Sequence, residues 1–77
     1  MVKPTRVTNS IRALRFARGE MTQAELADLI GVTRQTVIAI EQGRYSPSLE
    51  MAFQIAHAFK VPIDEVFHYP GSEEETR

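Results

Sequence analysis

The chain has 77 residues, no cysteine and a formal net charge of −1. This length allows one small domain with a marginal core, and the lack of cysteine excludes disulfide bridges and thiolate metal sites. No apolar run approaches the roughly 20 residues that span a bilayer, and the N-terminal residues lack the apolar centre of a signal peptide. We therefore expect a soluble, cytoplasmic protein with no membrane contact.

The charges are divided unevenly along the chain. Residues 1–44 hold seven basic and four acidic residues, a net +3, whereas residues 45–77 hold two basic and six acidic residues, a net −4. A basic half that faces a polyanion suits a nucleic-acid-binding protein. The net charge argues weakly against this interpretation, and a solvated mixed surface would show a similar distribution.

The first predicted helix follows an N-terminal arm, residues 1–8. Thr8 or Asn9 can cap its start, because their side-chain oxygens accept hydrogen bonds from free backbone N–H groups. Apolar residues then recur at three-residue spacing, which is typical of a helix with one buried face. Gly19 ends the helix after about Arg18.

The second and third predicted helices are separated by a very short connection. Thr22 and Glu25 have the spacing of a capping box, which starts the second helix, and Gly31 stops it. Thr33 caps the third helix, which ends at Gly43. Because so few residues join them, the two helices must cross at a steep angle.

Two further helices complete the prediction. Ser48 caps a fourth helix over residues 49–60, whose wide apolar stripe makes it the expected centre of the core. Residues 61–69 form a short fifth helix with Pro62 near its start, where a missing N–H costs little. Residues 70–77 are an acidic tail that we expect to be disordered. No strand pattern is found, so the expected fold is all-α, with five helices in one domain.

The segment Gln23–Gln42 has the residue types that two tightly crossing helices require. They are a small residue where the backbones approach, a glycine in the turn and apolar residues on the facing sides: Ala27, Gly31, and Leu26, Ile30, Val32, Val37 and Ile40. With "MTQAELADLIGVT" and "IEQGRYSPS", the segment resembles the helix-turn-helix of the Cro and phage-repressor type, the XRE family. The resemblance covers about residues 9–69. It implies a compact five-helix domain that binds operator DNA, usually as a two-fold dimer, to regulate transcription.

The third helix would then be the recognition helix, Arg34–Gln42. In helix-turn-helix proteins the N-terminal part of this helix enters the major groove. Arginine pairs with guanine and glutamine with adenine, and small apolar side chains can contact thymine methyl groups. The predicted base-reading residues are Thr33, Arg34, Gln35, Ile38, Ala39 and Gln42.

Phosphate contacts are expected on both sides of this helix. Free N–H groups and the positive dipole end favour an anion at the start of the second helix, and the loop after the third helix resembles the family's phosphate-binding loop. The predicted phosphate-binding residues are Thr22, Gln23, Thr36, Arg44, Tyr45 and Ser46. The resemblance also implies an ion pair between Arg15 and Glu41, which would tie the first helix to the third. Arg12 and Arg18 are interpreted as surface residues.

The expected assembly is a homodimer on a pseudo-palindromic operator, because one recognition helix contacts only a few base pairs. The predicted dimer contact comes from the fifth helix, through Ile63, Val66, Phe67 and Tyr69. Lys60 stands where glycine often ends the fourth helix in the family, which predicts a positive φ at this residue.

Functions other than DNA binding have less support in the sequence. The acidic net charge is compatible with an antitoxin-like or other protein-interaction module that reuses the fold and has an unknown protein partner. An enzyme is not expected, because the sequence has no nucleophile–base pair, no glycine-rich phosphate loop and too little chain to enclose a pocket. His57 and His68 lack metal-ligand spacing, so neither a metal nor a cofactor is expected.

Overall fold

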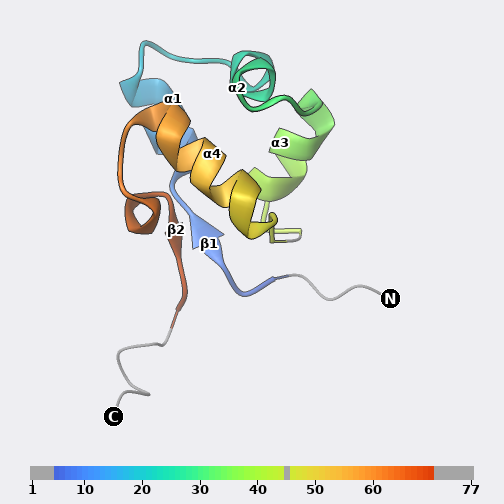
Figure 1. Cartoon of the computed structure of the whole chain (residues 1–77), viewed down its shortest axis with the longest axis vertical. Helices are drawn as coiled ribbons and strands as arrows, with labels where there is room; N and C mark the ends of the chain where they lie inside the picture. The colour runs from blue at the N-terminus through green and yellow to red at the C-terminus, as the bar shows by residue number, and fades with distance from the viewer. Residues whose placement is uncertain (1–4, 45, 71–77) are drawn as a thin grey trace.

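The computed structural model describes residues 5–44 and 46–70. In these ranges the chain forms four α-helices, one 3₁₀ turn and a pair of two-residue strands (Figure 1). Their order is β1 (Thr8–Asn9), α1 (Ile11–Ala17), α2 (Gln23–Ile30), α3 (Arg34–Glu41), α4 (Leu49–Phe59), the 3₁₀ turn η1 (Ile63–Glu65) and β2 (Phe67–His68). None of the helices in these ranges is long and apolar enough to cross a membrane. Residues 1–4, 45 and 71–77 lie outside the described residues, and with them part of the predicted arm and most of the predicted tail.

The α2–α3 unit forms as its capping residues predict. The Thr22 hydroxyl accepts a hydrogen bond from the Glu25 N–H at 3.0 Å, and the Glu25 carboxylate accepts one from the Thr22 N–H at 2.9 Å. Gly31 ends α2 with φ 75°, a conformation that residues with a Cβ adopt only at a cost. Thr33 then caps α3 by accepting from the Thr36 N–H at 3.2 Å. The predicted capping box, turn glycine and cap are therefore confirmed.

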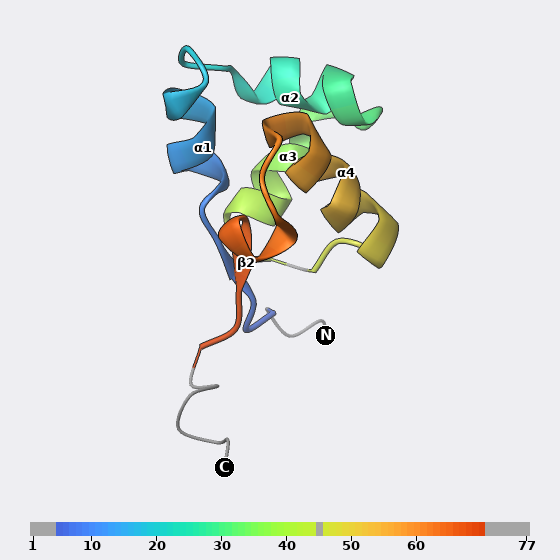
Figure 2. The same cartoon turned by 60° about the vertical axis from the view of Figure 1, so that its left-hand side comes forward.

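Helix α4 lies at the centre of Figure 1 and packs its apolar stripe into the core. Its first turn is capped by the Ser48 hydroxyl, which accepts from the Met51 N–H at 3.1 Å. It ends at Lys60, whose φ of 59° lies in the left-handed region, as predicted. Figure 2 shows α2 above α1 and α4, with α3 behind α4. The largest fully buried side chains in the described ranges are Phe59, Ile11, Leu26, Ile40, Ile55, Val37 and Val66.

The C-terminal segment differs from the predicted fifth helix. Only Ile63–Glu65 is helical, as a single 3₁₀ turn, and β2 then pairs with β1. The antiparallel partners are Thr8 with His68 and Asn9 with Phe67. Beside this pair, the Ser10 N–H donates to the Val66 carbonyl at 2.8 Å. These long-range hydrogen bonds satisfy backbone groups that a continuing helix would have paired locally. The predictions of a fifth α-helix and of a fold without strands are wrong.

Helix α1 also begins later than predicted. Thr8 and Asn9 belong to β1, and Ser10 is the residue before the helix, without a side-chain hydrogen bond to the first turn. Asn9 still satisfies one backbone group there, because its Oδ1 accepts a hydrogen bond from the Ile11 N–H at 3.1 Å. At the other end, Gly19 follows the helix with φ 78°, as expected.

Candidate nucleic-acid interface

Helix α3 presents a polar outer face because its apolar residues point into the core. Val37 and Ile40 are 1% and 2% exposed, which fixes the helix with one side buried. The six predicted base-reading residues lie on the remaining surface, four of them exposed (Thr33, Arg34, Gln35 and Gln42) and two half-buried (Ile38 and Ala39). The outward face of α3 is therefore accessible and could enter a DNA groove.

Three side chains, two on α3 and one on its C-terminal cap residue, are available to a ligand. Among the described residues, Arg34, Gln35 and Gln42 have no side-chain hydrogen bond or ion pair. Thr33 differs, because its hydroxyl caps the helix and also lies 3.0 Å from the Thr36 hydroxyl. The free donors of α3 are therefore a guanidinium and two amides, the groups that pair with guanine and adenine edges.

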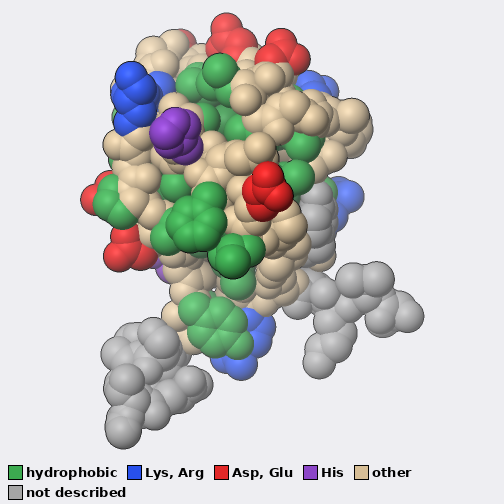
Figure 3. Space-filling view, viewed as in Figure 1, with side chains coloured by type: hydrophobic (Ala, Val, Ile, Leu, Met, Phe, Trp, Pro, Cys, Tyr) green, Lys and Arg blue, Asp and Glu red, His purple; other side chains and the backbone are tan. Residues whose placement is uncertain are grey.

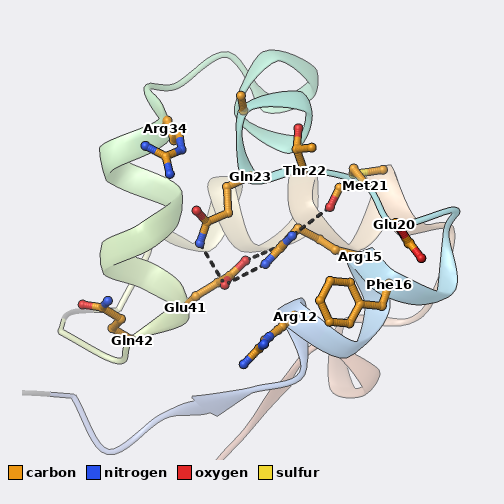
Figure 4. Close-up of a pocket in the computed structure, with 11 residues that line it drawn as sticks. Arg12, Arg15, Phe16, Glu20, Met21, Thr22, Gln23, Arg34, Glu41 and Gln42 are labelled. Atoms are coloured by element: carbon orange, nitrogen blue, oxygen red, sulfur yellow. Dashed lines mark hydrogen bonds and ion pairs between the residues drawn. The ribbon is translucent and has the colours of Figure 1, made fainter.

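A surface hollow lies between α3, α1 and the start of α2 (Figure 4). It brings the predicted phosphate-binding residues Thr22 and Gln23 together with Arg34 and Gln42 of α3. Arg12 lines the same hollow, although the sequence suggested only a surface residue. Residues predicted to bind DNA, at the start of α2 and at the two ends of α3, therefore line one concave surface.

The floor of the hollow is an ion pair, with both partners largely buried. The Arg15 Nε donates to Glu41 Oε2 at 2.6 Å and its Nη2 to Oε1 at 3.2 Å, so the contact is bidentate. A third bond runs from Arg15 Nη1 to the Met21 carbonyl at 2.8 Å. Gln23 Nε2 also donates to Glu41 Oε1, at 3.3 Å. The ion pair implied by the resemblance is present, and it neutralises a carboxylate that would otherwise repel an anion in the hollow.

Arg12, interpreted from the sequence as a surface residue, is exposed and lines the hollow. Its side chain is exposed, and its guanidinium carbon lies 5.4 Å from the centroid of the Phe16 ring, one helical turn away. Contact with the ring face holds the cation near the rim of the hollow. The i, i+4 spacing of Arg12 and Phe16 was the available signal, because residues four apart lie on the same face of a helix.

The other side of α3 carries the loop that leads to α4. Arg44 and Ser46 are exposed there, as phosphate binding requires, while Tyr45 lies outside the described residues. The Ser46 hydroxyl lies 2.5 Å from that of Thr5, so the N-terminal segment reaches this loop. Thr36, the remaining predicted phosphate-binding residue, is half-buried near the start of α3.

The residues predicted to make the dimer contact are not equally accessible. Val66 is fully buried in the core, so its side chain cannot take part in a surface contact, and its assignment is corrected. Ile63 and Phe67 are half-buried and Tyr69 is 51% exposed. Exposed apolar residues on α4, Leu49 and Phe53, add to the apolar surface of the molecule. Figure 3 shows hydrophobic side chains gathered on the face formed by α4 and β2.

Metal binding finds no support in the geometry of the described part of the chain. No three His, Asp or Glu side chains there converge in a way that could hold an ion. The His68 ring instead lies beside the Ser10 hydroxyl, with Nε2 3.1 Å from its oxygen.

The known proteins with similar sequences are named as transcriptional regulators. An uncharacterized HTH-type transcriptional regulator from Methanocaldococcus jannaschii is 53% identical over 53 residues, which are 69% of this chain and 80% of the relative. The HTH-type regulator YgzD from Bacillus subtilis is 48% identical over 77% of this chain and 88% of its own length. The phage CTXphi transcriptional repressor RstR from Vibrio cholerae is 41% identical over 77% of this chain, but over 52% of its own length.

The same relationship is found among solved structures and family models. The crystal structure of the restriction-modification controller protein C.AhdI from Aeromonas hydrophila is similar, with a TM-score of 0.65 and 34% identity over 71% of this chain and 78% of that protein. A family model described as helix-turn-helix matches residues 11–66, from the start of α1 to the buried Val66. The chain therefore belongs to the Cro and phage-repressor type (XRE) helix-turn-helix family of DNA-binding transcriptional regulators.

Proposed function

We propose that this regulator recognises a specific operator by placing α3 in the major groove, and that it acts as a repressor or autoregulator. The observation that carries the proposal is the outer face of α3, where Arg34, Gln35 and Gln42 are exposed and have no partner among the described residues. Polar side chains that are held on a rigid helix and left unpaired suit the recognition of base edges.

Base contacts are assigned to the first two turns of α3. The proposed partners are guanine O6 and N7 for Arg34, and adenine N6 and N7 for Gln35. Thr33 and Gln42 extend the polar surface at the two ends of the helix. Ile38 and Ala39, both half-buried, offer methyl groups that suit contact with thymine.

Phosphate contacts are assigned to the two sides of α3. The hollow side supplies Thr22 and Gln23 at the start of α2, together with Arg12 of α1. Thr36 adds a hydroxyl in the first turn of α3, outside the lining of the hollow. Gln23 gives one amide hydrogen to Glu41, which orients the amide and leaves its second hydrogen for a phosphate. The loop side supplies Arg44, Tyr45 and Ser46. Such contacts orient a protein on the duplex without carrying sequence information.

The active species is proposed to be a two-fold homodimer on a pseudo-palindromic site. Tyr69, Phe67 and Ile63, with Leu49 and Phe53 of α4, form the proposed dimer surface, hereafter called the apolar face. Removing these side chains from water is the driving force for such an association. The two copies of α3 would then lie about 34 Å apart, one turn of DNA.

The proposed domain covers residues 9–69, with residues 1–8 as an arm and residues 70–77 as a tail. Repression follows physically if the operator overlaps a promoter, because a bound dimer excludes the polymerase from the same surface. Two similar proteins are described in related terms, RstR as a phage transcriptional repressor and C.AhdI as a restriction-modification controller. A protein-interaction module such as an antitoxin is the second candidate, since the apolar face could also bind a different protein.

The test is selection of bound duplexes from a random pool, followed by titration of the preferred duplex and its single-base variants at several salt concentrations. Arg34→Ala should cost about 1–3 kcal/mol on the preferred duplex and relax the preference at one position per half-site. Arg44→Ala and Arg12→Ala should weaken all duplexes about equally and each lower the salt slope by about one unit per protomer. Equal losses on every sequence for Arg34→Ala would make Arg34 a phosphate contact. Absence of any salt-dependent DNA binding would favour the protein-interaction alternative.

A further inference from the structure

The side chain of Asn9 connects three parts of the molecule. Its Nδ2 donates to the Ile40 carbonyl at 3.0 Å and reaches the Glu41 carbonyl at 3.4 Å, while its Oδ1 accepts from the Ile11 N–H at 3.1 Å. Its backbone lies in β1, opposite Phe67 of β2. One small amide thus joins the start of α1 to the end of α3, across more than 30 residues of sequence.

The hydrogen bonds from Asn9 to α3 are made at the C-terminal end of the helix. The last four carbonyls of an α-helix have no partner within it and need one from elsewhere. In α3, three of these carbonyls accept hydrogen bonds from the backbone that follows: Ile38 from the Gln42 N–H, Ile40 from the Gly43 N–H and Ala39 from the Arg44 N–H. The Glu41 carbonyl receives its side-chain bond from Asn9.

These polar bonds restrict α3 in ways that its buried side chains do not. Burial of Val37 and Ile40 is non-directional, so it holds the helix against the core without fixing its tilt or rotation sharply. Hydrogen bonds are directional, because the angle at the hydrogen prefers values above about 150° and the bond weakens steeply below about 120°. Arg15 holds the Glu41 side chain and Asn9 holds the neighbouring backbone, so two polar contacts locate the C-terminal end of α3.

We propose that Asn9 is a positioning residue that sets the orientation of α3 in the DNA groove without touching DNA. The inference rests on the proposed role of α3 in recognition. At 1.5 Å per residue, α3 is about 12 Å long, so a tilt of about 5° at the Asn9 end moves the Arg34 end by about 1 Å. Productive contacts require placement to within about 0.5 Å, so such a shift weakens bidentate pairing with a base.

Two substitutions separate this role from general stability. Asn9→Asp keeps the shape and the acceptor for the Ile11 N–H but loses the donor to α3. Asn9→Ala removes all three side-chain hydrogen bonds without adding a charge. Ser10→Ala is the matched control. It removes the neighbouring contact between the Ser10 hydroxyl and His68, which also joins the two chain segments but does not involve α3.

The DNA measurement is the ratio of affinities for the preferred duplex and for its single-base variants. We expect both Asn9 variants to lower this ratio by about 3- to 10-fold, and Ser10→Ala to leave it unchanged. Loss of folded protein, or the added charge of Asp, would weaken all duplexes equally and would not move the ratio. A ratio that stays at the wild-type value in Asn9→Ala would overturn the proposal, even if Asn9→Asp lowers it.

Amide hydrogen exchange without DNA gives an independent measurement. The N–H groups of Gln42, Gly43 and Arg44 close the end of α3, and we expect them to exchange about 5- to 10-fold faster in both Asn9 variants. Unchanged exchange there would overturn the positioning role. If the wild-type protein binds no duplex, the proposed function fails, and the exchange result still decides whether Asn9 holds α3.

Discussion

Substitution of Arg15 provides the most direct test of how α1 is joined to α3. Arg15→Met removes three hydrogen bonds and leaves the Glu41 carboxylate with only the Gln23 amide at 3.3 Å among the described residues. Because the two side chains are 8% and 10% exposed, water can replace little of what is lost. Removing one partner of a buried pair costs about 3–5 kcal/mol.

That cost is large for a chain of this length. A domain of 77 residues has a free energy of unfolding of about 4–12 kcal/mol, and 1 kcal/mol corresponds to about 4–8 °C in the midpoint of thermal unfolding. We therefore expect Arg15→Met to lower the midpoint by at least about 12 °C. Arg15→Ala should cost about 1 kcal/mol more, because it also removes the aliphatic stem that packs beneath the charge.

The assay is urea unfolding of the single and double variants of a mutant cycle. Arg15→Met combined with Glu41→Met should be more stable than the sum of the single losses predicts, with a coupling energy of about 2–3 kcal/mol. Arg18→Met is the control, since it removes an exposed arginine near the end of the same helix and should change stability by less than about 0.5 kcal/mol. A coupling energy below about 0.5 kcal/mol would refute the view that this pair holds α1 to α3.

Three further predictions follow from backbone conformation and exposed surface. Lys60→Gly should raise stability by about 1 kcal/mol in thermal unfolding, because it relieves the left-handed conformation at φ 59°; an unchanged midpoint would contradict this account. Gly31→Ala should lower stability by about 1–2 kcal/mol, from backbone strain alone, since no atom lies within 4 Å of the added methyl group. Tyr69→Arg should shift sedimentation toward the monomer with little change in the thermal midpoint of the dilute protein, because Tyr69 is 51% exposed. If the variant associates as the wild type does, Tyr69 lies outside the dimer contact.

Local sequence signals predicted α2, α3 and α4 well because their ends are set by nearby residues. Thr22 and Glu25 satisfy each other's backbone groups within a single turn, and Gly31 supplies the one conformation that the short connection needs. Such interactions span three or four residues and leave a pattern in the sequence. The pairing of Arg15 with Glu41 spans 26 residues, and the family resemblance, not any local pattern, indicated it.

The C-terminal segment could not be predicted in the same way. Its structure depends on hydrogen bonds to residues about 60 positions earlier, and each strand has only two residues, too few to show alternation. Valine and aromatic residues at positions 66–69 favour extended backbone, a signal that was present but outweighed by the expectation of a fifth helix. The bonds from Asn9 to α3 were missed for the same reason, since they depend on where β1 places that side chain.

The β1–β2 pair also affects how a newly made chain reaches its folded state. Thr8 and His68 are 60 positions apart, so β1 leaves the ribosome long before its partner is synthesised. The contacts between α2 and α3 are local and can form early, whereas closing so long a loop costs more entropy and comes late. Until then Val66 is missing from the core, and the interior stays open to chaperones and proteases at that point. The β1–β2 pair can therefore close only after the chain has been synthesised through β2.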